Sequence, residues 1–138
     1  MSEVRVYSVT WGLCFLLLLT FVSCQEKRLD RFEREALDYT LRNCPHRLDP
    51  ITTLDSVVFH NDGTLDYIYY YTVNLDSQMI ETFRKKSDDI AEITLRNVRN
   101  NIDLKAVKES GLNIIYLYRD SLTGKTIQTF RFTKEQYQ

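Results

Sequence analysis

The sequence is poor in the features that usually mark catalysis or phosphate binding. Its four glycines are scattered singly, so none belongs to a glycine-rich loop that could cradle a phosphate. It has neither a Gly-x-Ser-x-Gly elbow nor a His-Glu-x-x-His pair. The 18 basic and 19 acidic residues nearly cancel, which leaves no broad positive field for a nucleic-acid backbone. We therefore expect no nucleic-acid partner, no cofactor and no enzyme activity.

Histidine is also scarce, with two residues in the chain. Each is followed at short spacing by an aspartate: His46 by Asp49, and His60 by Asp62. A metal site needs three or four converging ligands, which these pairs do not supply. We interpret all four residues as loop and turn residues. An unrecognised envelope enzyme that uses one of these pairs is the least supported alternative.

One region has no charge at all. Val9 to Val22 is an uncharged run of about 14 residues, and the charged stretch Gln25 to Arg28 follows shortly after it. A helix needs about 20 apolar residues to span a bilayer, so the run is short for a transmembrane helix. The pattern is typical of a secretory signal peptide, and we predict one over residues 1–23.

The end of this run, Phe21-Val22-Ser23-Cys24, resembles the lipobox of bacterial lipoproteins, although that family usually has an aliphatic residue where Phe21 stands. The resemblance implies that the Cys24 thiol takes a diacylglycerol, that fatty acids such as palmitate follow, and that Cys24 becomes the first mature residue. The protein would then be held at a bacterial membrane, on the outer-membrane or periplasmic side of the cell envelope.

Two alternatives to lipid attachment stay open. Cleavage after Val22-Ser23-Cys24 would release a soluble secreted or periplasmic domain that begins at Gln25. Cys24 could also be an ordinary apolar residue of the signal peptide, as Cys14 is. With the leader removed and Cys24 acylated, Cys44 remains alone and cannot form an internal disulfide. We interpret Cys44 as a small buried apolar side chain.

The region after a short spacer, residues 24–28, has the length of one domain, residues 29–138. Its first predicted element is a helix that ends before Pro45. Apolar and small side chains recur there at three- and four-residue spacing: Leu29, Phe32, Ala36, Leu37, Thr40 and Leu41.

Two predicted hairpins follow, with helices between them. "ITTLDSVVFH" and "TLDYIYYYTV" alternate with a period of two and are joined by a turn that contains Asp62-Gly63. "LNIIYLYR" and "TIQTFRFT" form the second pair, around Gly124. Between them we predict a long helix capped by Asp76 and interrupted at Asn100-Asn101, then a short helix capped by Asp103.

The order helix, hairpin, helix or helix pair, hairpin predicts an α+β fold. We expect a four-stranded antiparallel sheet with the helices packed on one face. The pattern of "CP" after a helix, Asp49, "TTLDSV" and a tyrosine-alternating strand resembles a family of small exported bacterial domains of unknown function. That resemblance implies no activity.

Alternation along the second predicted strand separates two groups of side chains. Tyr67, Tyr69 and Tyr71 share one face, which we expect to lie against the helices. The opposite face would present an apolar and aromatic group, Ile68, Tyr70, Ile115 and Leu117. Such groups often mark partner surfaces, although core packing beneath a covering helix is an open alternative.

These observations predict a membrane-anchored binding or interaction module of the bacterial envelope. Its partner would be an envelope protein, a peptide or a glycan. An inhibitor or immunity-type protein is a special case of this prediction.

Overall fold

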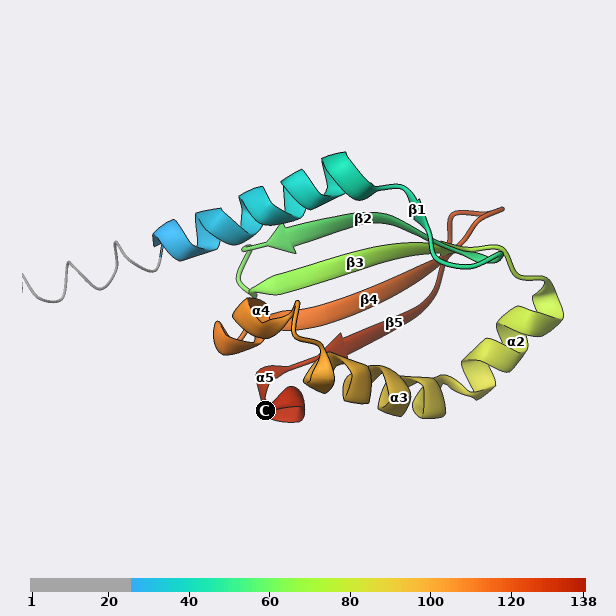
Figure 1. Ribbon diagram of the computed structural model, residues 1–138. Helices are drawn as coiled ribbons and strands as arrows, with labels where there is room; N and C mark the ends of the chain where they lie inside the picture. Colours follow the sequence, from blue (N-terminus) through green and yellow to red (C-terminus); the bar gives the residue numbers. More distant parts are fainter. Residues whose placement is uncertain (1–25) are drawn as a thin grey trace, which may run out of the picture. The chain divides into compact units, whose positions relative to one another are not determined.

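The computed structural model describes residues 26–138, which contain a first helix over residues 26–43, a five-stranded sheet and four further helices (Figure 1). The chain divides into two compact units, residues 1–32 and 33–138. The sheet and the sites described below all lie within residues 33–138. The predicted signal peptide and Cys24 lie outside the described residues. None of the helices in the described range has the length and apolar character needed to cross a bilayer.

The sheet contains β1 (His46–Arg47), β2 (Thr52–His60), β3 (Asp66–Val73), β4 (Asn113–Asp120) and β5 (Thr126–Phe132). Its strands are ordered β1-β2-β3-β4-β5. Strands β3 and β4 are parallel, whereas the other three neighbouring pairs are antiparallel. The sheet is therefore mixed.

The α+β class is confirmed, but the prediction of a four-stranded antiparallel sheet is wrong. Both predicted hairpins form, β2 with β3 and β4 with β5. They join through the parallel pair β3–β4, because the helices between them carry the chain back to the end of the sheet where β3 began. The edge strand β1 was not predicted, since two residues are too few to show a period.

The connection between the hairpins contains α2 (Ser77–Lys85), α3 (Ser87–Asn100) and α4 (Lys105–Glu109). The Asp76 cap is confirmed, because its carboxylate accepts a hydrogen bond from the Met79 backbone N–H at 2.8 Å. The prediction of one long helix is wrong, because the helix breaks at Lys86.

The predicted cap of the short helix is also wrong. Leu104 occupies the N-cap position of α4, without a side-chain hydrogen bond. The Asp103 backbone N–H instead donates to the Asn101 side-chain oxygen at 2.8 Å. Lys108 of α4 donates to the last carbonyls of α3, those of Val98 and Arg99, and to that of Asn101. These bonds satisfy acceptors that the end of α3 leaves free.

The first helix contacts the edge of the sheet at β2. The Thr40 hydroxyl donates to the Val57 carbonyl and accepts from the Val57 N–H, both at 2.8 Å. Thr40 therefore satisfies an edge position that would otherwise be open to another strand. Ala36 is buried, whereas Leu37 and Leu41 are 58% and 74% exposed. The predicted apolar stripe is thus only partly covered in the described part of the chain.

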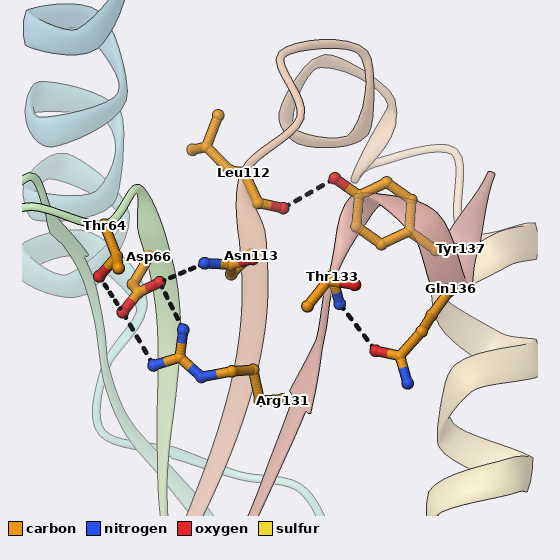
Figure 2. Close-up of polar contacts among 8 residues, drawn as sticks. All are labelled: Thr64, Asp66, Leu112, Asn113, Arg131, Thr133, Gln136 and Tyr137. Carbon is orange, nitrogen blue, oxygen red and sulfur yellow. Dashed lines mark hydrogen bonds and ion pairs between the residues drawn. The ribbon is translucent and has the colours of Figure 1, made fainter.

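A short helix, α5 (Lys134–Tyr137), closes the chain and was not predicted. The Tyr137 hydroxyl donates to the Leu112 carbonyl at 2.7 Å, and the Gln136 side chain accepts from the Thr133 N–H (Figure 2). Leu112 is completely buried. The end of the chain is therefore fastened to the start of β4.

Candidate functional site

Each face of the central strands carries a distinct set of side chains. We call one the tyrosine face: Tyr67, Tyr69 and Tyr71 of β3 with Ile114, Tyr116 and Tyr118 of β4. We call the other the isoleucine face: Ile68 and Tyr70 of β3 with Ile115 and Leu117 of β4. The register aligns Tyr69 with Tyr116 and Ile68 with Ile115. Phe83 of α2 lies against Tyr118, on the tyrosine face.

The isoleucine face brings together the four residues predicted to bind a partner. Ile68 pairs with Ile115, and Tyr70 with Leu117. The two isoleucines are only 9% and 3% exposed, whereas Tyr70 and Leu117 are half-buried. The guanidinium carbon of Arg119 lies 4.8 Å from the centre of the Tyr70 ring. The role of these residues in binding stays a prediction.

A buried carboxylate lies beside the isoleucine pair, at the start of β3 (Figure 2). Asp66 accepts hydrogen bonds from Thr64 at 2.9 Å, from Asn113 at 2.7 Å, and from Arg131 at 2.9 and 3.0 Å. Burial alone would raise the pKa of Asp66, but these hydrogen bonds lower it below its ordinary value. The cluster ties β3, β4 and β5 together. A lone aspartate in an apolar strand was its signal in the sequence.

The tyrosine face contains four half-buried rings that stack across β3 and β4, which we call the tyrosine array: Tyr69, Tyr71, Tyr116 and Tyr118. Ring centres are 5.2 Å apart for Tyr69 and Tyr116, and 5.0 Å apart for Tyr71 and Tyr118. Tyr71 and Tyr116 are 5.9 Å apart, which joins the two pairs. The alternation of tyrosines in β4, at the same phase as in β3, was the signal for this array.

The hydroxyls of the tyrosine array have no hydrogen-bond partner among the described residues. Within residues 26–138, none of the four makes a hydrogen bond to the protein. No fully buried side-chain oxygen or nitrogen in the described chain lacks a partner, so none of these hydroxyls is completely buried. Burial raises the pKa of Tyr116 to about 12 and also raises the pKa of the other three. Each phenol is therefore protonated at neutral pH and can both donate and accept.

Hollows lie at both ends of this series of rings. The aromatic hollow, of about 180 Å³, is lined by Tyr39, Val57, Tyr67, Tyr69, Asn101 and Asp103. The α2 hollow, of about 500 Å³, is lined chiefly by Leu75, Met79, Phe83 and Ile90. Tyr69 belongs to the first hollow and the array continues to Tyr118, which lies 5.5 Å from Phe83 of the second. Contacts between aromatic rings thus connect the two hollows.

The predicted histidine pairs are not brought together. His46 lies in β1 and His60 at the end of β2, both exposed, rather than in loops. The Asp49 carboxylate accepts the backbone N–H groups of Ile51 and Thr52 and so forms a turn. Within the described chain, no group of three or more potential ligands could hold a metal ion.

Cys44 is half-buried, with a free thiol, just after the first helix. Burial and the nearby Asp55 carboxylate raise the pKa of this thiol. A raised pKa keeps the sulfur in its unreactive thiol form at neutral pH.

Residues 27–128 match the family described as a domain of unknown function (DUF8479), and the chain belongs to this family. The expected resemblance to a domain of unknown function is therefore confirmed, whereas export and the lipobox stay predictions. No protein with curated annotation matches the sequence significantly.

Two solved structures share the fold. One is a "putative secreted protein" of Pseudomonas aeruginosa, with a TM-score of 0.70 and 14% identity over 83% of this chain and 96% of that one. The other is EpsS, the pilotin of the Vibrio vulnificus type 2 secretion system, with a TM-score of 0.57 and 12% identity over 83% and 94% of the two chains. At such low identity these likenesses establish the fold alone.

Proposed function

We propose that this member of the DUF8479 family is a lipid-anchored interaction module of the bacterial cell envelope. It binds a protein partner through the tyrosine array and catalyses no reaction. The observation that carries the proposal is a row of phenol hydroxyls that are not completely buried and make no hydrogen bond within the described chain.

The array is suited to binding a polypeptide. Its stacked rings hold the hydroxyls in fixed positions, because neighbouring rings on β3 and β4 support one another. Tyrosine contributes contact area and a hydrogen bond at little cost in conformational entropy. Peptide carbonyls and side-chain carboxylates are ready acceptors for such phenols. A partner segment lying on the array would therefore gain apolar contact and hydrogen bonds together.

The proposed anchor lies directly before the folded region. The described chain is already helical at residue 26, two residues after Cys24. A diacylglycerol on Cys24 would leave almost no flexible tether between lipid and helix. One acyl group binds a membrane only weakly, whereas two or more give stable anchoring. Stable anchoring would therefore keep the protein in the membrane fraction of the cell.

The fold relationships support a protein partner in the envelope. The pilotin with this fold belongs to a type 2 secretion system, and the other relative is described as secreted. By that likeness, we propose that the partner is a protein component of an envelope assembly rather than a glycan. The isoleucine face is the second candidate surface, since it carries the half-buried pair Tyr70 and Leu117.

A pair of variants tests the array. The double substitution Tyr71→Phe with Tyr118→Phe removes two hydroxyls and keeps both rings. If each hydroxyl contributes about 1 kcal/mol, affinity for the partner falls roughly 30-fold. The readout is recovery of a specific envelope protein after crosslinking in the native host, followed by measurement of its affinity.

The matched control is Tyr70→Phe, which removes one hydroxyl from the isoleucine face. It should leave partner recovery unchanged. Loss of the partner in Tyr70→Phe, together with retention in the double variant, would overturn the array and assign binding to the isoleucine face.

The anchor is tested by the intact mass of the mature N-terminal peptide from the membrane fraction, with Cys24→Ala in parallel. A thioether-linked diacylglycerol that disappears in the variant supports anchoring. A free N-terminus at Gln25 would contradict it and indicate a soluble secreted domain.

A further inference from the structure

The aromatic hollow has walls on several sides. Tyr67 and Tyr69 lie 5.7 Å apart with their ring planes at 63°, so they form two walls that are far from parallel. Tyr39 of the first helix also lines the hollow and is 42% exposed. Burial is the largest cause of the raised pKa of Tyr67 and Tyr69, and an electrostatic interaction with Tyr39 adds to both shifts.

Negative charge lies at the same place. Asp103 lines the hollow, and its carboxylate has no ion-pair partner among the described residues. The Lys108 ammonium, on the following helix, is engaged with three backbone carbonyls instead. The hollow therefore combines aromatic walls with a carboxylate that lacks a cation.

Aromatic rings attract cations through their negative faces, and a carboxylate adds direct charge attraction. Several rings and one acidic group around a small hollow form the usual setting for a bound ammonium or guanidinium group. The volume, about 180 Å³, suits one side chain rather than a whole peptide segment.

We propose that the aromatic hollow is a cation-binding site that takes one arginine or lysine side chain of the protein partner. This inference rests on the proposed function. It extends that function by assigning a chemical requirement to the partner: a basic residue that fills the hollow while neighbouring residues lie on the tyrosine array, which starts at Tyr69.

The experiment titrates the full-length ¹⁵N-labelled chain, in detergent micelles, with N-acetyl-argininamide and N-acetyl-lysinamide. We expect saturable shifts of the Tyr69, Asn101 and Asp103 amides, with dissociation constants of roughly 1–10 mM. N-acetyl-citrullinamide, which has nearly the shape of the arginine compound but no charge, should cause no saturable shift. Equal binding of the citrulline compound, or no saturation with either basic compound, would overturn the proposal.

Two variants locate the site. Asp103→Asn removes the charge and should weaken binding about tenfold. Its matched control is Asp88→Asn, an exposed carboxylate at the start of α3 that does not line the hollow. Tyr39→Leu, at an exposed position of the first helix, should also weaken binding without unfolding the domain. Unchanged affinity in both Asp103→Asn and Tyr39→Leu would overturn the site.

Partner recovery separates this inference from the proposed function. If wild-type protein recovers a specific partner and Asp103→Asn recovers it equally well, the cation site is wrong and the interaction role stands. If wild-type protein recovers no partner while the titration succeeds, the cation site stands and the proposed function fails.

Discussion

The two faces of the central strands use polar groups in opposite ways. On the isoleucine face, the Asp66 carboxylate is fully engaged by Thr64, Asn113 and Arg131. On the tyrosine face, the hydroxyls of the array bind nothing within the described chain. Engaged polar groups hold a fold together, whereas unengaged groups at a structured surface are available to a partner. The first face therefore stabilises the sheet and the second is suited to recognition.

The same contrast appears in the direction of the pKa shifts. Asp66 has a lowered pKa, so its contribution to stability is present above the ordinary aspartate pKa and is lost as pH falls through the folded value. Tyr116 has a pKa raised to about 12, so its contribution is complete below the ordinary tyrosine pKa and is lost as pH rises through the folded value. One face weakens in acid and the other in alkali.

The largest effect is expected at Asp66. Asp66→Ala leaves Thr64, Asn113 and Arg131 without their acceptor and should lower the free energy of unfolding by about 2–3 kcal/mol. Urea unfolding at pH 7 measures this loss. Arg131→Met should lower the free energy of unfolding by less, because the Arg131 side chain is 46% exposed. Without Arg131, the Asp66 carboxylate still accepts hydrogen bonds from Asn113 and Thr64.

The difference between wild type and Asp66→Ala should shrink as the pH falls below about 4, the ordinary aspartate pKa, because the unfolded chain takes up a proton there before the folded carboxylate does. If Asp66→Ala lowered the free energy of unfolding equally at pH 7 and pH 3, the loss would not come from the hydrogen bonds of the charged Asp66 carboxylate.

The next effect is alkaline sensitivity of the tyrosine face. The free energy of unfolding should fall as pH rises above about 10, the ordinary tyrosine pKa, because unfolded tyrosines ionise before those of the array. Tyr116→Phe should reduce the slope of this fall, as measured by urea unfolding between pH 8 and 11. An unchanged slope in Tyr116→Phe would contradict burial of that ring.

A smaller effect is expected at the sheet edge beside the tyrosine face. Thr40→Val keeps the shape of the side chain but leaves both the N–H and the carbonyl of Val57 without their partner. We expect a loss of about 1–2 kcal/mol in the free energy of unfolding. Thr82→Val is a matched control, since that exposed hydroxyl bonds only within its own helix. Equal losses in the two variants would show that the two hydrogen bonds between Thr40 and the Val57 backbone do not stabilise the edge of the sheet.

The smallest effect is expected at Arg119 on the isoleucine face. A double-mutant cycle of Arg119→Gln and Tyr70→Leu should give a coupling energy of about 0.5 kcal/mol, the usual size of an exposed cation–π contact. Neither substitution should change partner recovery. A coupling above about 2 kcal/mol would show that this pair is as important to the sheet as the Asp66 cluster.

Local pattern predicted the elements better than their arrangement. The β2–β3 hairpin follows from period-two alternation around Asp62-Gly63, and Gly63 has the positive φ, 82°, that such a turn requires. The Asp76 cap was likewise readable from its neighbours. The parallel joining of β3 and β4 was not, because a connection through several helices can return to either end of a sheet.

The site was partly predictable. Alternation placed Tyr67, Tyr69 and Tyr71 on one face and Ile68 and Tyr70 on the other, as the strand register confirms. The tyrosines of β4 alternate in the same way, but the pattern did not place them beside those of β3, because the parallel pairing of the two strands was not predicted. The pattern also did not predict that Tyr39 and Asp103, which lie far apart in the chain, would line one hollow.

The sequence by itself determined the α+β class, the two hairpins and the alternation of tyrosines along β3, because these depend on side chains a few residues apart. Only the tertiary structure decided the mixed sheet, the Asp66 cluster, the free row of hydroxyls and the aromatic hollow. Each of these depends on which distant segments pack together. That choice is made by burial over the whole domain, and no short stretch of sequence contains it.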